Sequence, residues 1–163
     1  MLAIKYIHNV LGGQSIQQEC LDYLRSKFSL MEGQVFTSSA GDLKCKKIIH
    51  AVGPRWGGGR LQEELTLYNC INHCFDEVKK HKLQSIAIPP ISTGIFGYPL
   101  EKAVKTIVEA LYERDKEGKH LPPLIFFVDN KDDSLHLFEK ELKQRYQNHE
   151  HQPVSRGLQQ TSG

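Results

Sequence analysis

Residues 85–100, SIAIPPISTGIFGYPL, begin as a short apolar strand, continue as a glycine-containing loop and end at the start of a helix. Pro99 stands where the first turn of a helix tolerates a missing amide N–H. Gly94 and Gly97 permit backbone conformations and close approaches that other residues forbid. A strand that passes through such a loop into a helix is typical of layered α/β folds, in which ligands lie beyond the carboxyl ends of the strands.

The composition of this loop favours a phosphate-containing ligand. Consecutive amides between Gly94 and Gly97, together with the positive end of the following helix, predict a cradle for an anion. Ser92 and Thr93 add hydroxyl groups, and Phe96 and Tyr98 supply flat apolar surfaces of the kind that suit a sugar or base joined to a phosphate. The alternative is a tight strand-to-helix turn whose glycines serve packing only, because an isolated Gly-x-x-Gly pair is a weak signal.

Hydrophobic periodicity predicts helices and strands along the rest of the chain. The predicted helices cover residues 15–28, 61–81, 100–114 and 134–146, and the predicted strands cover residues 34–39, 45–52, 85–89 and 124–128. The run at 124–128 is apolar throughout, which is typical of a strand buried on both faces of a parallel sheet. Residues 1–10 are compatible with a short strand, and the polar residues 148–163 predict a disordered tail.

The composition excludes several other classes of protein. A chain of 163 residues fits one domain, and a net charge of +2 with scattered lysines and arginines does not form the basic stripe of a nucleic-acid-binding protein. Four scattered cysteines do not make a disulfide framework, and the sequence shows neither a secretory signal nor the ~20-residue apolar run of a membrane helix. We therefore expect a soluble protein of a reducing compartment. The expected location is the nucleus, the cytoplasm or both, and no cofactor is expected.

Several other residues of types that often serve in catalysis or metal binding are expected to have structural roles. His50 stands in an apolar run and is expected to be a hydrogen-bonded core histidine. Trp56 follows a Gly-Pro-Arg turn and is expected to pack under a loop rather than flank a pocket. Cys70, His73 and Cys74 lie one helical turn apart, but a zinc site needs about four ligands and no partner pair is evident, so no metal site is predicted.

Three stretches of the chain together resemble the macrodomain family. Residues 86–99, from Ile86 to Pro99, resemble the second ligand loop of that family; residues 48–56, IIHAVGPRW, resemble its strand and following loop; and residues 13–20, GQSIQQEC, resemble the start of a helix. The resemblance covers about residues 12–146 and is closest to the macrodomains of macro-domain-containing poly(ADP-ribose) polymerases.

This resemblance implies a fold and a ligand. The fold would be a macrodomain-like three-layer α/β/α arrangement with a mixed sheet, and the ligand would be ADP-ribose, free or attached to proteins. The residues expected to wrap the diphosphate and its ribose are Ser92, Thr93, Gly94, Ile95, Phe96 and Gly97. Phe96 would lie near the distal ribose, or else serve as a core or lid aromatic residue. Asp129, after the last strand, would lie beside the adenine or instead cap the helix that follows.

The chain departs from the family before Gly12. Complete macrodomains begin with strands that lead into an Asn-Ala-Ala-Asn-like loop and a run of glycines, and neither is found here. We therefore expect an atypical segment at 1–11, a partial macrodomain at 12–147 that lacks its first strands, and the tail at 148–163. An alternative start, a partial gene product and a genuine shortened form would all give this pattern. A sheet without its neighbours exposes unpaired edges, so a partner chain covering the missing edge is expected.

Three functions remain open at this stage. The leading interpretation is a module that binds ADP-ribose and reads ADP-ribosylation. The second is an ADP-ribosyl hydrolase, although no Asp or Glu stands in the loop at 92–97 to serve as a general base, and the catalytic residues are unknown. The third is a truncated interaction remnant without a ligand. The target proteins and the preference for mono- or poly(ADP-ribose) are not predicted.

Overall fold

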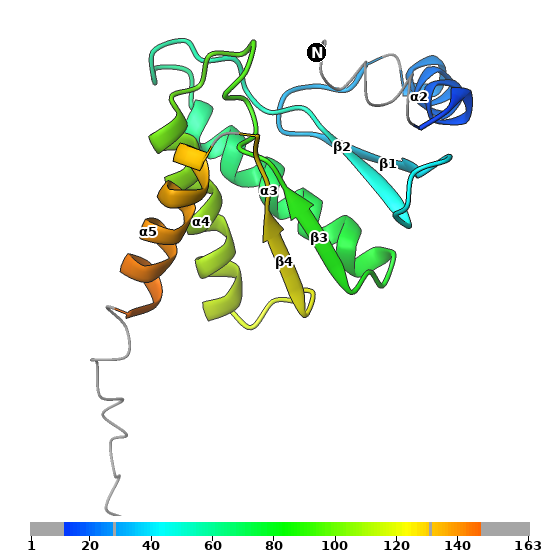
Figure 1. The fold of residues 1–163 in the computed structure, drawn as a ribbon. Coiled ribbons are helices and arrows are strands. Elements are labelled where there is room, and N and C mark those ends of the chain that lie inside the picture. Colours follow the sequence, from blue (N-terminus) through cyan, green and yellow to red (C-terminus); the bar gives the residue numbers. More distant parts are fainter. Residues whose placement is uncertain (1–11, 28, 131, 148–163) are drawn as a thin grey trace, which may run out of the picture.

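The fold of the chain is α/β, as predicted (Figure 1). The computed structural model describes residues 12–27, 29–130 and 132–147, so the expected N-terminal segment and tail lie outside the described residues. The elements are, in chain order, α2 (Gln14–Lys27), β1 (Val35–Ser39), β2 (Lys47–Ala51), α3 (Glu63–Lys80), β3 (Ser85–Ile88), α4 (Leu100–Lys116), β4 (Leu124–Phe127) and α5 (Asp132–Gln147). Each predicted helix and strand between residues 15 and 146 is present, with its ends shifted by no more than two residues. Within the described ranges, no helix is both long and apolar enough to cross a bilayer.

The strands form two separate ladders. β1 and β2 pair antiparallel, with Phe36 opposite His50, and β3 and β4 pair parallel, with Ile86 opposite Ile125. The chain therefore contains both strand orientations of a mixed sheet. Among the described strands, no hydrogen-bonded ladder joins the two pairs.

Helices cover both faces of the β1–β2 ladder. Successive residues of a strand point to opposite faces. The Phe36 ring contacts the Tyr23 ring of α2, with ring centroids 4.2 Å apart, whereas the Thr37 hydroxyl donates a hydrogen bond to Glu77 of α3 at 2.6 Å. α2 and α3 therefore lie on opposite sides of these two strands, which gives this part of the chain a three-layer arrangement.

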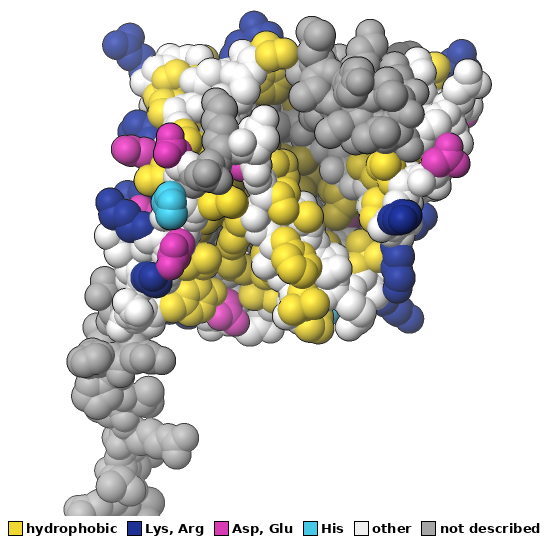
Figure 2. Space-filling model, in the orientation of Figure 1, with side chains coloured by type: hydrophobic (Ala, Val, Ile, Leu, Met, Phe, Trp, Pro, Cys, Tyr) yellow, Lys and Arg dark blue, Asp and Glu magenta, His cyan; other side chains and the backbone are white. Residues whose placement is uncertain are grey.

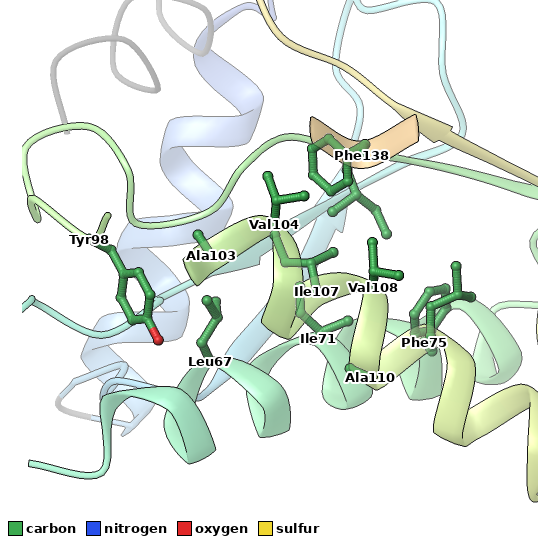
Figure 3. Packing of buried hydrophobic residues seen from close by; sticks show 12 residues of the cluster. Leu67, Ile71, Phe75, Tyr98, Ala103, Val104, Ile107, Val108, Ala110 and Phe138 are labelled. Atoms are coloured by element: carbon green, nitrogen blue, oxygen red, sulfur yellow. The ribbon is translucent and has the colours of Figure 1, made fainter. Parts of the chain in front are cut away.

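The hydrophobic core is centred on α4. Its apolar residues are spaced so that they meet α3 on one side and α5 on the other, and β3 and β4 add their inward-facing side chains (Figure 3). The fully buried residues of α4 in this cluster are Ala103, Val104, Ile107, Val108 and Ala110. Phe138 of α5 closes the far side and stacks on Phe127 of β4, with ring centroids 4.2 Å apart. α4 therefore has far more buried residues than a helix with a single apolar stripe.

The prediction that residues 124–128 are buried on both faces is wrong. Ile125 and Phe127 point into the core, but Leu124, Phe126 and Val128 are 57%, 51% and 42% exposed. Figure 2 shows hydrophobic side chains gathered on this outer face, over β3 and β4. The apolar composition suits a strand in a fully covered sheet, and no described element lies over this face.

The edge of β3 that faces away from β4 is also open in the described structure. The carbonyl oxygens of Gln84 and Ile88 accept hydrogen bonds from the amides of Leu124 and Val128. Because hydrogen-bonding groups alternate along a strand, the amides and carbonyls of Ser85 and Ala87 point to the opposite edge, where no described strand pairs with them.

This alternation predicts a pattern of amide exchange. In the purified chain, the amides of Ser85 and Ala87 should exchange with solvent much faster than those of Ile86 and Ile88, which face β4. Residue-resolved hydrogen exchange by NMR measures all four. Equal protection of the four amides would show that the edge is covered.

The two faces of α5 should respond differently to truncation. Phe138 is 2% exposed, whereas Leu135 is 38% exposed. Phe138→Ala should lower the free energy of unfolding by about 3–5 kcal/mol, and Leu135→Ala by less than about 1 kcal/mol. Denaturant titration of both variants compares them, and similar losses would contradict this packing.

Candidate functional site

The loop between β3 and α4 is folded on itself by its own backbone. The Thr93 amide and hydroxyl both donate to the Pro90 carbonyl oxygen, at 3.3 and 2.8 Å. The Gly97 amide donates to Gly94 at 2.9 Å, and the Tyr98 amide donates to Ser92 at 3.0 Å. Gly97 has a φ of +65°, a left-handed conformation that glycine adopts without strain. The conformation of the loop is therefore held by its own hydrogen bonds.

Three consecutive amides of the loop have no acceptor in the described structure. Gly94, Ile95 and Phe96 follow one another along the exposed rim, and their N–H groups have no partner among the described residues. α4 begins directly after the loop, and Pro99 at its N-cap has no side-chain acceptor for the first amides. Free amides next to a helix N-terminus attract an anion, so this rim has the donors of the predicted phosphate cradle.

Ser92 is the strained residue of the loop. Its φ of +71° is left-handed, which is costly for a residue with a Cβ. Its hydroxyl oxygen is buried and has no hydrogen-bond partner among the described residues. The backbone of Gly53 approaches it so closely that a Cβ at Gly53 would collide with the Ser92 hydroxyl. Ser92 therefore lies where the loop after β3 meets the loop after β2.

The loop after β2 is joined to the cradle by a direct hydrogen bond. The Trp56 amide donates to the Phe96 carbonyl oxygen at 2.9 Å, and the Trp56 ring packs on Tyr98 with centroids 4.8 Å apart. The Arg55 guanidinium lies 5.7 Å from the centre of the Phe96 ring, and Lys102 lies 5.9 Å from Trp56. Trp56 is half-buried and packs against the core, as expected. The two cations close to the cradle are Arg55 and Lys102.

The end of β4 contributes Asp129 at the same edge. Because β3 and β4 are parallel, the residues that follow both strands emerge together. The Asp129 carboxylate accepts a hydrogen bond from the Asn130 amide at 2.7 Å. Asn130 lies two residues before the start of α5 at Asp132. The structure therefore brings Asp129 to the edge of the sheet that carries the 92–97 loop.

Sequence reasoning missed one residue of this region, Glu63. Its side chain is 2% exposed, and its carboxylate accepts hydrogen bonds from three amides of the loop after β2. A usable signal exists in the sequence, because a glutamate that directly follows a glycine-rich loop and opens a helix is placed to bind free amides. This carboxylate is occupied by its amide donors and does not stand at the cradle as a free base.

His50 is a structural residue, as expected. Its Nε2 lies 2.8 Å from the Ser38 hydroxyl and its ring stacks on Phe36. Cys20 lies 3.8 Å from the same nitrogen, a spacing that resembles a nucleophile and its base. Burial, reinforced by the nearby Glu19 carboxylate, raises the pKa of the Cys20 thiol. The thiol therefore stays protonated at neutral pH, which is the opposite of what a nucleophile needs.

The cysteines of α3 also pack as expected. Cys70 and Cys74 are buried, and the His73 ring nitrogen Nδ1 donates to the Gly33 carbonyl oxygen at 2.7 Å. Within the described ranges, no three His, Cys, Asp or Glu side chains are grouped so as to hold a metal ion.

An open groove of about 530 Å³ lies between α2 and α3, beside Tyr23 and Glu77. None of the 92–97 residues lines this groove, so the groove is separate from the cradle.

Comparison with known proteins identifies related sequences. The family model described as Macro domain matches residues 5–107. An O-acetyl-ADP-ribose deacetylase of Enterobacter cloacae is 33% identical over 141 residues, which cover 86% of this chain and 77% of that protein. The human protein mono-ADP-ribosyltransferase PARP14 is 34% identical over 141 residues, which cover 81% of this chain and only 8% of that much longer protein.

Comparison with solved structures gives the same fold. A variant of the Oceanobacillus iheyensis macrodomain, solved with ADPR, has a TM-score of 0.79 and 27% identity to this chain. The alignment covers 85% of this chain and 75% of that structure, so about a quarter of the related domain has no aligned counterpart here.

The neighbouring hydroxyls of Ser92 and Thr93 allow a matched test of the loop geometry. Ser92→Ala removes a buried hydroxyl without a partner and should raise the free energy of unfolding by about 1 kcal/mol, because such groups carry a desolvation cost. Thr93→Val removes a hydroxyl that donates to Pro90 and should lower it by about 1 kcal/mol. Thermal and denaturant unfolding measure the stability of both variants. A destabilised Ser92→Ala variant would contradict the unpaired state of that hydroxyl.

Proposed function

This chain belongs to the macro domain family, and on that premise we propose that it is a binding module that recognises ADP-ribose, free or attached to proteins. The observation that carries the proposal is the run of amides at Gly94, Ile95 and Phe96, which have no acceptor among the described residues and lie beside the N-terminus of α4. A diphosphate supplies the negative charge and the several acceptor oxygens that such a run can bind.

The neighbouring residues suit the rest of the ligand. The Ser92 hydroxyl, which is buried and has no partner among the described residues, can donate a hydrogen bond to a phosphate or ribose oxygen if the loop shifts slightly. Phe96 offers a ring face for the distal ribose, and Arg55 adds positive charge beside it. Asp129, which follows the neighbouring parallel strand, is proposed to lie beside the adenine. The solved macrodomain with ADPR supports this choice of ligand by family resemblance.

A second candidate function is hydrolysis of ADP-ribose linkages. It is favoured by several bacterial relatives named as O-acetyl-ADP-ribose deacetylases, among them that of Enterobacter cloacae, of which the alignment covers 77%. The chemistry of the cradle offers less support. No carboxylate stands in the 92–97 loop, and the Glu63 carboxylate is bound by three amides. We therefore place binding before hydrolysis, and the catalytic residues of any hydrolysis stay unassigned.

A partner chain is part of the proposal. The outer face of β4 exposes Leu124, Phe126 and Val128, and Ser85 and Ala87 direct their backbone groups to an edge that no described strand pairs with. Open edges and apolar faces of this kind are normally covered in native proteins. We propose that a strand from another polypeptide covers them, in addition to the ADP-ribosylated proteins that the cradle would recognise.

We propose further that binding needs no cofactor and that the protein acts in the nucleus, the cytoplasm or both. All four cysteines are free thiols. Free thiols are typical of reducing compartments, which supports this localisation. No metal or nucleic acid is part of the proposed function.

Gly94 gives the sharpest test of the cradle. A Cβ at Gly94 would meet nothing within 4 Å, so Gly94→Glu should fold normally while placing a negative charge at the anion site. Isothermal titration with ADP-ribose should show binding by the natural chain and none by Gly94→Glu. Gly94→Gln is the matched control, because it adds the same bulk without the charge and should retain measurable binding.

The outcomes of this titration separate the candidate functions. Absence of heat from the natural chain at millimolar ADP-ribose would overturn the binding proposal and favour an interaction remnant. Equal loss of binding in Gly94→Glu and Gly94→Gln would show that bulk, rather than charge, matters at this position.

Hydrolysis is tested on the same protein. An automodified polymerase carrying labelled ADP-ribose is incubated with the natural chain and, in parallel, with Gly94→Glu. Under the binding proposal the label stays on the polymerase for hours in both samples. Release by the natural chain alone would make the protein a hydrolase.

A further inference from the structure

The carboxylate of Glu63 binds the loop that precedes α3. It accepts hydrogen bonds from the amides of Gly57 at 2.9 Å, Gly59 at 3.0 Å and Leu61 at 2.6 Å. The side chain is 2% exposed, and Glu63 is the first residue of an 18-residue helix. One side chain therefore holds three alternate amides of a five-residue stretch in place.

The held loop is continuous with the residue that contacts the cradle. Trp56 directly precedes Gly57, and a Cβ at Gly59 would lie 3.1 Å from the Trp56 ring, so the glycine loop lies against the indole. On its other side, Trp56 donates its amide hydrogen bond to the carbonyl of Phe96 and packs on Tyr98. Glu63 is thus connected to the Phe96 end of the amide run through its hydrogen bond from Gly57, the backbone between Gly57 and Trp56, and the hydrogen bond from Trp56 to Phe96.

The hydrogen bonds to Glu63 hold the strained backbone that precedes it and reduce the backbone freedom of the 57–61 loop. Three successive glycines at 57–59 would be highly mobile if unrestrained, and Gln62, just before Glu63, has a left-handed φ of +60°. Such a backbone persists only where its surroundings hold it. Burial would raise the pKa of the Glu63 carboxyl, but the hydrogen bonds from its own amide and from the amides of Gly57, Leu61 and Gly59 lower it below the ordinary value. The side chain is therefore a carboxylate at neutral pH and binds the amides as an anion.

We propose that Glu63 is a positioning residue for the ligand site: by holding the 57–61 loop it fixes Trp56, and through Trp56 it fixes the Phe96 end of the amide run. This inference rests on the proposed binding of ADP-ribose. A loop that is already held in its binding conformation loses less entropy when the ligand arrives, so its affinity is higher. Glu63 itself stays buried and does not touch the ligand.

Trp56 reports on this arrangement directly, because it is the single tryptophan of the chain. Glu63→Gln keeps the size of the side chain but removes its charge and one acceptor oxygen. Glu64→Gln is the matched control, since Glu64 is the next residue of α3 and is exposed. Intrinsic fluorescence of the ligand-free proteins and titration with ADP-ribose are measured for the natural chain and both variants, with far-UV circular dichroism to verify folding.

The expected result has two parts. In Glu63→Gln the Trp56 emission should shift to longer wavelength, because the released loop exposes the indole to water. Its Kd for ADP-ribose should rise about tenfold, as it would if only one loop in ten kept the binding conformation. Glu64→Gln should match the natural chain in both readouts. If Glu63→Gln does not fold, Glu63→Asp, which keeps the charge on a shorter arm, should show smaller changes in the same directions.

Each outcome bears on a different statement. A change in emission without a change in affinity, or the reverse, would overturn the positioning role, as would equal changes in Glu63→Gln and Glu64→Gln. If the natural chain does not bind ADP-ribose, the proposed function fails, and with it the consequence of Glu63 for affinity. The shift of Trp56 in the ligand-free protein would still show that Glu63 holds the loop.

Discussion

The packing of α4 between α3 and α5 holds this chain together. Val104, Ile107 and Val108 are fully buried at the centre of the cluster, and the small residues Ala103 and Ala110 allow close approach to the neighbouring helices. The strands are short and divided between two ladders, so they cannot supply a continuous core of their own. Everything at the carboxyl edge of the strands is positioned by helices that this packing fixes.

The same packing explains how the proposed phosphate cradle stays in place although the described strands form only two short ladders. The cradle loop enters α4 directly, and Tyr98, which is buried between the loop and the start of α3, anchors its last turn (Figure 3). Trp56 packs on Tyr98 and bonds to Phe96, so the loop after β2 is tied to the same helix pair. The side of the site that is proposed to bind the diphosphate therefore depends on α3 and α4 more than on the strands that are open at their edges.

The open sheet has a physical cost that the cradle does not share. Phe126 and its neighbours expose apolar surface that folding normally buries, so this face contributes little to the free energy of unfolding. A strand added at the edge of β3 would pair Ser85 and Ala87 and would cover part of that surface. Stability and the proposed partner binding are thus linked on the face of β4, while the proposed ligand binding is organised around Trp56.

The sequence by itself determined the order of helices and strands, because hydrophobic periodicity and turn residues act locally, and it located the loop at 92–97. It also determined the macrodomain resemblance. Only the tertiary structure decided which residues are exposed: Leu124 and Phe126 have the composition of a buried strand, but burial depends on what lies over them. The hydrogen bonds of Glu63, on which its proposed role rests, likewise required three dimensions, because its amide donors and the path through Trp56 to Phe96 are set by how two loops meet.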